Sequence, residues 1–208
     1  MPSPRKAVLF SFLLLALAIP AWGQQDVDKL VQGTYTGAAG FKTIDGHPVL
    51  FVGKDGTVST FPQRYELYIS PTTSSPVSDP WDLKGGYGFR LVWGSYQGGK
   101  VRGYWITTPA IGPRVALWKQ HFFCWQPDGP GGSVQFWNQD RAAQGPPEDL
   151  EMWYFEIVDR DKQLVRIKNK YRGYVGLDGS KRLITGVSQP NAQPFRVDFG
   201  VTPFSDDK

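Results

Sequence analysis

Glycine and proline are the residues that most constrain what this chain can fold into. The sequence contains 24 Gly and 17 Pro, spread along its whole length. Both residues interrupt helices, so almost no window of about 12 residues is free of a helix breaker. The best helix signal is the short segment 26–32, DVDKLVQ, and helices are otherwise not expected.

Strand signals, in contrast, recur throughout the sequence. Short segments rich in Val, Ile, Phe, Tyr and Trp lie between turns made of Gly, Asp, Asn and Pro. The predicted strands are 49–52, 65–69, 89–93, 101–106, 115–118, 134–137, 154–158, 164–168, 183–185 and 195–199. Many short strands at spacings of about ten residues predict an all-β sandwich or barrel.

The first 23 residues have the layout of a cleaved signal peptide. Arg5 and Lys6 supply a positive end, 7–19 is apolar, and small residues precede Gln24. The apolar run is shorter than the roughly 20 residues that span a bilayer as a helix. We therefore expect a secreted or periplasmic protein without a transmembrane segment in the mature chain.

The remaining residues are expected to form one domain with little net charge. The predicted boundaries are 1–23 for the signal peptide, 24–200 for a single domain and 201–208 for a flexible tail. Arg5 and Lys6 lie in the leader, which has no acidic residue, so the formal net charge of +4 falls to +2 for the remainder. This balance argues against a nucleic-acid partner. The single cysteine, Cys124, cannot close an intrachain disulfide.

Three segments of the sequence resemble one another. Segments 51–56 and 174–179 share an aromatic residue, Val-Gly, one variable residue and Asp-Gly, and 123–129 is a looser version. Each is a predicted strand that runs into a turn. In each unit an aliphatic residue precedes this strand and an aromatic strand closes the unit: Ile44 and 65–69, Leu117 and 155–158, Ile167 and 195–199. One such four-strand unit cannot bury its inner face alone.

Three copies of a four-strand unit resemble the β-trefoil superfamily, in particular its fascin-like and ricin-B-like repeats. The resemblance is clearest in residues 164–199. It implies an all-β fold, a β-trefoil barrel of three repeats with loop insertions, following the cleaved signal peptide. The expected insertions are 70–86 and 140–149, and a hairpin around 95–100 is predicted to add two further strands.

Arrangements that could catalyse a reaction are scarce. His47 lies in a predicted turn and His121 in a predicted strand, without further ligands at metal spacing. The acids of 148–151 could serve a hydrolase, but sequence does not place an acidic partner opposite them. We therefore expect no enzymatic activity, no metal and no cofactor.

Aromatic residues indicate a ligand site. A partly exposed Trp or Tyr beside amides and carboxylates can stack on a sugar while the polar groups bind its hydroxyls. The predicted ligand-binding residues are Trp125, Asp128, Trp137, Asn138, Tyr174 and Asp178. The alternative is that the aromatic residues fill the core. The segment 135–137 matches the Gln-x-Trp signature of ricin-B-like lectins, where the motif is chiefly a core element.

A basic stripe is a second candidate site. Arg166, Lys168, Lys170 and Arg172 alternate along the sequence, and a strand would direct all four to one side, where they could bind a polyanion. A hairpin turn at 169–171 would break this alternation, and solvated outer-face charge is the alternative.

Together these features predict an exported, non-enzymatic binding module. Its expected partner is a carbohydrate or an anionic polysaccharide. The alternative is an exported protease inhibitor or protein-binding module, which would use the 70–86 or 140–149 loop to contact an extracellular protein.

Overall fold

The protein is mostly β-sheet. The computed structural model describes residues 22–53, 64–73, 88–96, 101–107, 121–129, 131–140 and 151–201. The strands are β1 Gly37–Lys42, β2 Val49–Gly53, β3 Arg64–Ile69, β4 Phe89–Tyr96, β5 Val101–Thr107, β6 His121–Pro127, β7 Val134–Asp140, β8 Trp153–Asp159, β9 Leu164–Asn169, β10 Gly173–Leu177, β11 Leu183–Val187 and β12 Pro194–Phe199. The described residues also form the helix α1, Trp22–Gln32, and the 3-10 turn η3, Gln189–Asn191. The all-β prediction is confirmed, while the predicted strand 115–118 lies outside the described residues.

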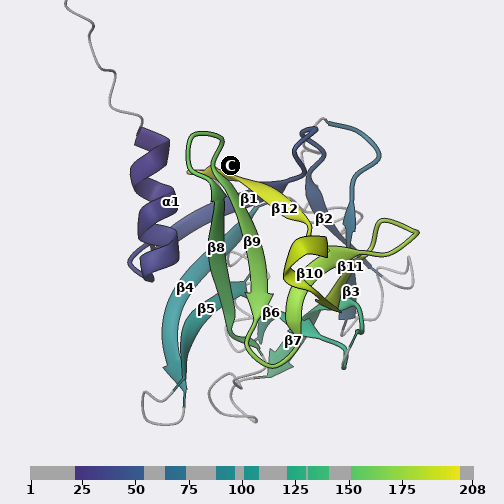
Figure 1. Ribbon diagram of the computed structural model, residues 1–208. Helices are drawn as coiled ribbons and strands as arrows, with labels where there is room; N and C mark the ends of the chain where they lie inside the picture. Colours follow the sequence, from purple (N-terminus) through teal and green to yellow (C-terminus); the bar gives the residue numbers. More distant parts are fainter. Residues whose placement is uncertain are drawn as a thin grey trace, which may run out of the picture.

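Half of the strands pair in a closed ring. Strand β1 pairs with β4 and β12, β5 pairs with β4 and β8, and β9 pairs with β8 and β12, in every case antiparallel. Figure 1 shows β4, β5, β8 and β9 running side by side through the centre of the molecule. Because the ring closes on itself, none of its strands presents an unpaired edge to another chain.

The other strands form three hairpins, β2 with β3, β6 with β7, and β10 with β11. Strand β3 also pairs with β7, and the bridges Tyr68 to Arg182 and Ser133 to Ile184 join the third hairpin to the other two. Each of the three similar sequence segments begins in the first strand of a hairpin, at Phe51, Phe123 and Tyr174. The repeated sequence therefore marks structurally equivalent positions.

Two predictions about the first half of the chain are wrong. Segment 65–69 does not close the first unit, because it is β3, which pairs along its length with β2. The strand that pairs with β1 is β4 rather than β3. The segment around 95–100 adds no extra strands, because it joins β4 to β5, whose ends pair at Tyr96 and Val101, within a sheet of 12 strands.

Aromatic side chains fill the interior of the ring. The rings of Phe41, Phe89 and Trp125 are mutually in contact, with centroids 5.1 to 5.9 Å apart. Trp153 lies against Trp125 at 5.8 Å and donates a hydrogen bond from Nε1 to the Trp125 carbonyl oxygen, 2.9 Å away. This large buried area supplies most of the stabilisation of a domain in which no disulfide is available.

The helix α1 covers one side of the sheet, next to β8 and β4 (Figure 1). Its residues Val27 and Leu30 are fully buried, and the helix contacts β8 and β12. It ends at Gly33, whose φ of +75° is the left-handed conformation that glycine favours after a helix. The predicted leader boundary after Gly23 falls within this helix, and no structural observation tests cleavage there.

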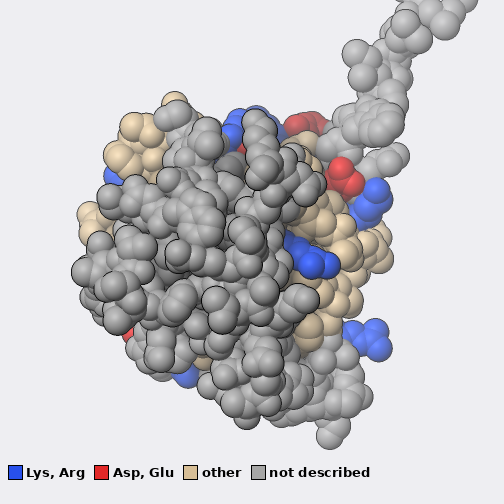
Figure 2. All heavy atoms as spheres, turned by 180° about the vertical axis from the view of Figure 1, so that it is seen from behind, with Lys and Arg blue, Asp and Glu red and all other residues tan. Residues whose placement is uncertain are grey.

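Ion pairs fix the polar side of α1. Asp28 pairs with Arg160 of the turn after β8 at 2.9 Å, and Asp26 pairs with Lys29 at 3.2 Å. In Figure 2, basic and acidic atoms lie next to one another on the side of the molecule where α1 lies. These pairs are exposed, so each contributes little to stability.

Neither of the helical segments in the described part of the chain has the length and apolar character needed to cross a membrane.

Candidate functional site

Trp125 is a core residue and not a ligand platform. Its side chain is 0% exposed and packs among Phe41, Phe89 and Trp153. The prediction of an exposed ring at this position is therefore wrong, and the alternative of a core-filling aromatic residue holds for it. Trp137 and Asn138 lie in β7, paired with Cys124 and Phe123 of β6, but their side chains are outside the described set.

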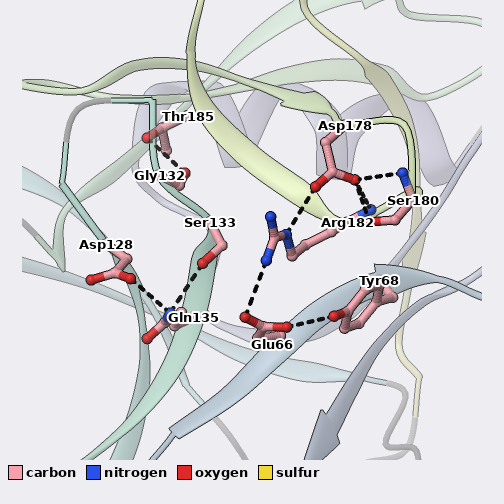
Figure 3. A network of polar contacts seen from close by, with 10 residues as sticks. All are labelled: Glu66, Tyr68, Asp128, Gly132, Ser133, Gln135, Asp178, Ser180, Arg182 and Thr185. Carbon is pink, nitrogen blue, oxygen red and sulfur yellow. Dashed lines mark hydrogen bonds and ion pairs between the residues drawn. The ribbon is translucent and has the colours of Figure 1, made fainter. Parts of the chain in front are cut away.

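Asp128 lies in the turn between β6 and β7, where Gln135 holds it. The side chain of Gln135 is nearly fully buried, and its Nε2 donates hydrogen bonds to Asp128 Oδ2 and Ser133 Oγ, both at 3.0 Å. Figure 3 shows this cluster beside the contact between Thr185 and Gly132. The Gln of the Gln-x-Trp segment therefore serves to fix a turn, and Asp128 remains at the surface.

Asp178 closes the turn between β10 and β11. Its Oδ1 accepts hydrogen bonds from Ser180 N, Ser180 Oγ and Arg182 N at 2.7 to 2.9 Å, and its Oδ2 accepts one from Arg182 Nε at 2.9 Å. These bonds, that of the Ser180 hydroxyl foremost, lower the pKa of the Asp178 carboxyl to about 2. Both oxygens are occupied within the turn, so the geometry supports a structural role rather than the predicted ligand contact.

Arg182 connects this turn to the first hairpin. Its Nη1 lies 3.3 Å from Glu66 Oε1, and the Tyr68 hydroxyl donates to Glu66 Oε2 at 2.5 Å (Figure 3). The hydrogen bond to Glu66 raises the pKa of Tyr68, because it favours the protonated phenol. The predicted residue Asp178 thus belongs to a network that joins two hairpins.

Tyr174 lies in a different polar cluster on the outer side of β8, β9 and β10. We call this cluster the Tyr174 face; it consists of Glu156, Arg166, Lys168, Tyr174 and Gln189. The Tyr174 hydroxyl is 2.8 Å from both carboxylate oxygens of Glu156, to which Gln189 Nε2 also donates at 3.2 Å. Burial of the phenol and its bond to Glu156 raise the pKa of Tyr174.

Lys168 brings a cation to the same face. Its Nζ lies 3.7 Å from Glu156 Oε1 and 4.9 Å from the centroid of the Tyr174 ring. The structure therefore brings together one residue predicted to bind sugar, Tyr174, with one predicted to bind a polyanion, Lys168. Asp178 lies four residues beyond Tyr174, roughly 13 Å away along an extended strand, and is not part of this face.

The four-residue basic stripe does not exist as a strand face. Strand β9 ends at Asn169 and β10 begins at Gly173, so Lys170 and Arg172 lie in the turn between them. Buried Asn169 fixes that turn, because its Oδ1 accepts hydrogen bonds from the backbone N–H groups of residues 171 and 172 at 3.0 and 3.1 Å. Only Arg166 and Lys168 share one side of β9.

Two arginines near this turn have donors without acceptors. The Nε atoms of Arg166 and Arg172 are buried and make no hydrogen bond. In the turn itself, Tyr171 is 48% exposed and Lys170 Nζ lies 5.4 Å from the centroid of its ring. The turn therefore presents an aromatic ring and two cations to solvent next to the Tyr174 face.

The sequence analysis did not identify Glu156 or Gln189 as site residues. Glu156 lies opposite Arg166 in the pairing of β8 with β9. Once this register is known, the alternation of side chains along the strands places Glu156 on the same side as Arg166. Gln189 lies in η3, a turn for which the sequence offered no ligand signal.

Of the residues considered for catalysis, His47 makes contacts that stabilise a turn. His47 Nδ1 lies 2.9 Å from the carbonyl oxygen of Ser70, and its backbone N–H donates to the Thr43 hydroxyl, so it holds the turn between β1 and β2. No cluster of His, Cys, Asp or Glu able to hold a metal occurs within the described ranges. The His121 side chain, 148–150 and nearly all of the two predicted insertions lie outside them.

Comparisons with known proteins give little information. No protein family model matches the chain, and no curated protein sequence matches it. One similar solved structure is "SeviL bound to asialo-GM1 saccharide", at 16% sequence identity and a TM-score of 0.44, with 80% of this chain and 99% of that chain covered. Likeness at this level does not establish a shared fold.

Proposed function

We propose that this protein is an exported, non-enzymatic β-trefoil module that binds carbohydrate through the Tyr174 face. The strand pairing supports the fold assignment. The chain divides into β1 to β4, β5 to β8 and β9 to β12, and in each unit the outer two strands join the ring while the inner two form a hairpin. The signal-peptide layout of 1–23 supports export.

The observation that carries the proposed function is the composition of the Tyr174 face. A sugar requires hydrogen-bond donors and acceptors for its hydroxyl groups and an aromatic surface for its C–H groups. Here Gln189 and Lys168 supply donors, Tyr174 supplies the ring and a hydroxyl group, and Glu156 positions all three side chains. Lys168 is partly exposed and flexible, so it can leave the ring and pair with a bound ligand.

Charge favours an acidic carbohydrate over a neutral one. Residues 159–199 contain nine Lys or Arg and four Asp or Glu. On the face itself Arg166 and Lys168 outnumber Glu156, and the neighbouring turn adds Lys170 and Arg172. A sulfated or carboxylated polysaccharide would supply anionic groups for these exposed and partly exposed cations.

The experiment is a glycan-array screen of the purified protein, followed by titration of the best ligand. We expect Tyr174→Ala to weaken binding at least tenfold without loss of thermal stability beyond a few degrees. Tyr68→Phe is the matched control, because Tyr68 also donates to a glutamate but lies in another network. The double variant Arg166→Ser, Lys168→Ser should also elute from a heparin column at a lower salt concentration than wild type.

Two results would refute the proposal. One is a silent array over both neutral and acidic glycans. The other is a ligand whose affinity is unchanged in Tyr174→Ala and reduced in Tyr68→Phe, because that would place the site on the network of the hairpins instead.

A further inference from the structure

A groove of about 340 Å³ lies where the turn before β9 meets β12. It is lined by Ile44 from the turn between β1 and β2, by Asp161, Lys162 and Gln163 from the turn between β8 and β9, by Leu164 at the start of β9, and by Arg196 of β12. It shares no residue with the Tyr174 face or with the networks of Figure 3. Its size is at the lower end of small-molecule sites, enough for one sugar unit.

Arg196 is the residue in this groove whose hydrogen bonding is incomplete. Its Nε is buried and makes no hydrogen bond, and the nearest carboxylate oxygen in an ion pair, Asp198 Oδ1, is 3.4 Å away. Asp198 is held more closely by Lys42, whose Nζ lies 2.6 Å from Oδ2. The Arg196 Nε faces Asp198 and is buried, but the side chain as a whole is 40% exposed, so the outer part of the guanidinium is available to a second carboxylate.

The rest of the lining combines polar groups with one exposed apolar residue. Ile44 is 57% exposed, which is unusual for a large aliphatic side chain, whereas Leu164 is only 6% exposed. Lys162 adds positive potential, although its Nζ is also 3.3 Å from Asp159. An apolar surface this small does not suit a lipid chain, but it matches the C–H face of a single sugar ring.

The turn that forms one wall has a fixed conformation. Gln163 has a φ of +55°, which is rare for a residue other than glycine, and its carbonyl oxygen accepts a hydrogen bond from the Val197 N–H at 3.0 Å. This bond ties the wall to β12, one residue from Arg196. The groove is therefore held in shape before any ligand arrives, which lowers the entropic cost of binding.

We propose that this groove binds a carboxylate-bearing sugar unit, with its carboxylate on the Arg196 guanidinium and its ring against Ile44. The amide of Gln163 and the carboxylate of Asp161, which also line the groove, would hydrogen-bond the ring hydroxyls. The choice of a sugar acid rests on the proposed carbohydrate function, whereas the groove and its partly exposed arginine do not. The protein would then hold an acidic polysaccharide through this groove as well as through the Tyr174 face.

The test follows backbone amide shifts of the purified full-length protein by NMR during titration with glucuronate, glucose or acetate. Glucuronate is expected to shift amides of 44, 161–164 and 196 in a saturable manner, and glucose or acetate at the same concentration to shift them far less. Arg196→Gln is expected to weaken glucuronate binding at least tenfold, and Arg196→Lys to restore part of it. Arg160→Gln is the matched control, because Arg160 lies in the turn that forms one wall of the groove but does not itself line the groove.

Several outcomes would overturn the inference. Absence of saturable shifts at these amides would do so, and so would unchanged affinity in Arg196→Gln. Equal shifts with acetate would show that the groove accepts any carboxylate and not a sugar acid. Tyr174→Ala separates the two proposals, because it should leave glucuronate shifts at the groove unchanged even if the Tyr174 face binds no glycan.

Discussion

The Asp178 turn gives a prediction whose size and pH dependence follow from the structure. Replacing Asp178 by Ala removes the acceptor of the Ser180 and Arg182 donors in the turn between β10 and β11. Lowering of the Asp178 pKa from 3.8 to about 2 would correspond to roughly 2.4 kcal/mol without screening. The carboxylate is 22% exposed and its partner Arg182 is 36% exposed, so we expect about 1 to 2 kcal/mol after screening by solvent.

The sign of the pH dependence is fixed by the direction of the shift. Because the folded-state pKa is lowered, the stabilisation is fully present above the unfolded pKa of 3.8 and is lost as pH falls towards about 2. Urea unfolding of wild type and Asp178→Ala at pH 7, 5, 4 and 2 measures this directly. We expect the difference in unfolding free energy to be similar at pH 7 and 5 and to decrease below pH 4.

A conservative variant separates charge from hydrogen bonding. Asp178→Asn keeps an oxygen for the Ser180 and Arg182 N–H groups but loses the charge that pairs with Arg182 Nε. The unfolding free energy of Asp178→Asn should lie between those of wild type and Asp178→Ala. Its difference from Asp178→Ala should be nearly independent of pH between 7 and 2. Asp45→Asn, an exposed acid in the turn between β1 and β2, is the control. A wild-type advantage over Asp178→Ala that stays constant from pH 7 to 2 would refute the reasoning.

The buried aromatic core and the Asn169 turn give two further predictions. Trp125→Ala should lower the unfolding free energy by about 3 to 5 kcal/mol, because it leaves a cavity beside Phe41, Phe89 and Trp153. Urea denaturation measures this loss, and a loss below about 1 kcal/mol would contradict the core position of Trp125. Asn169→Ala should cost about 1 to 3 kcal/mol, because two backbone N–H groups and the Met152 carbonyl lose their partner; faster amide exchange at 171 and 172 would report it, and unchanged exchange would count against it.

Strand content could be predicted from the sequence because apolar and aromatic segments alternate with turn residues. Strand β1 could not, since its sequence GAAGFK lacks the β-branched residues that mark strands, and it forms because β4 and β12 pair with it on both sides. Likewise, the aromatic pattern of 65–69 is typical of a closing strand, but this segment pairs with β2. The strand that pairs with β1 is β4, which lies much further along the sequence.

The site was only partly predictable because orientation depends on register. Trp125 and Tyr174 each lie in the first strand of a hairpin, yet the first is in the core and the second is partly exposed. The basic stripe failed because a single buried amide, Asn169, turns the chain before the alternation is complete. Glu156 and Arg196 were recognisable only after pairing of β8 and β12 with β9 placed them.

The pairing of β1 with β12 also determines how the domain would respond to mechanical load. Ala39 is opposite Phe199 and Lys42 is opposite Arg196, and Gly200 N–H donates to the Ala38 carbonyl oxygen at 3.1 Å. Residues 36 and 201 therefore leave the two strands at the same end. Pulling these two residues apart would break the hydrogen bonds between β1 and β12 one after another rather than all at once. Tension applied there would therefore open the ring at a low force.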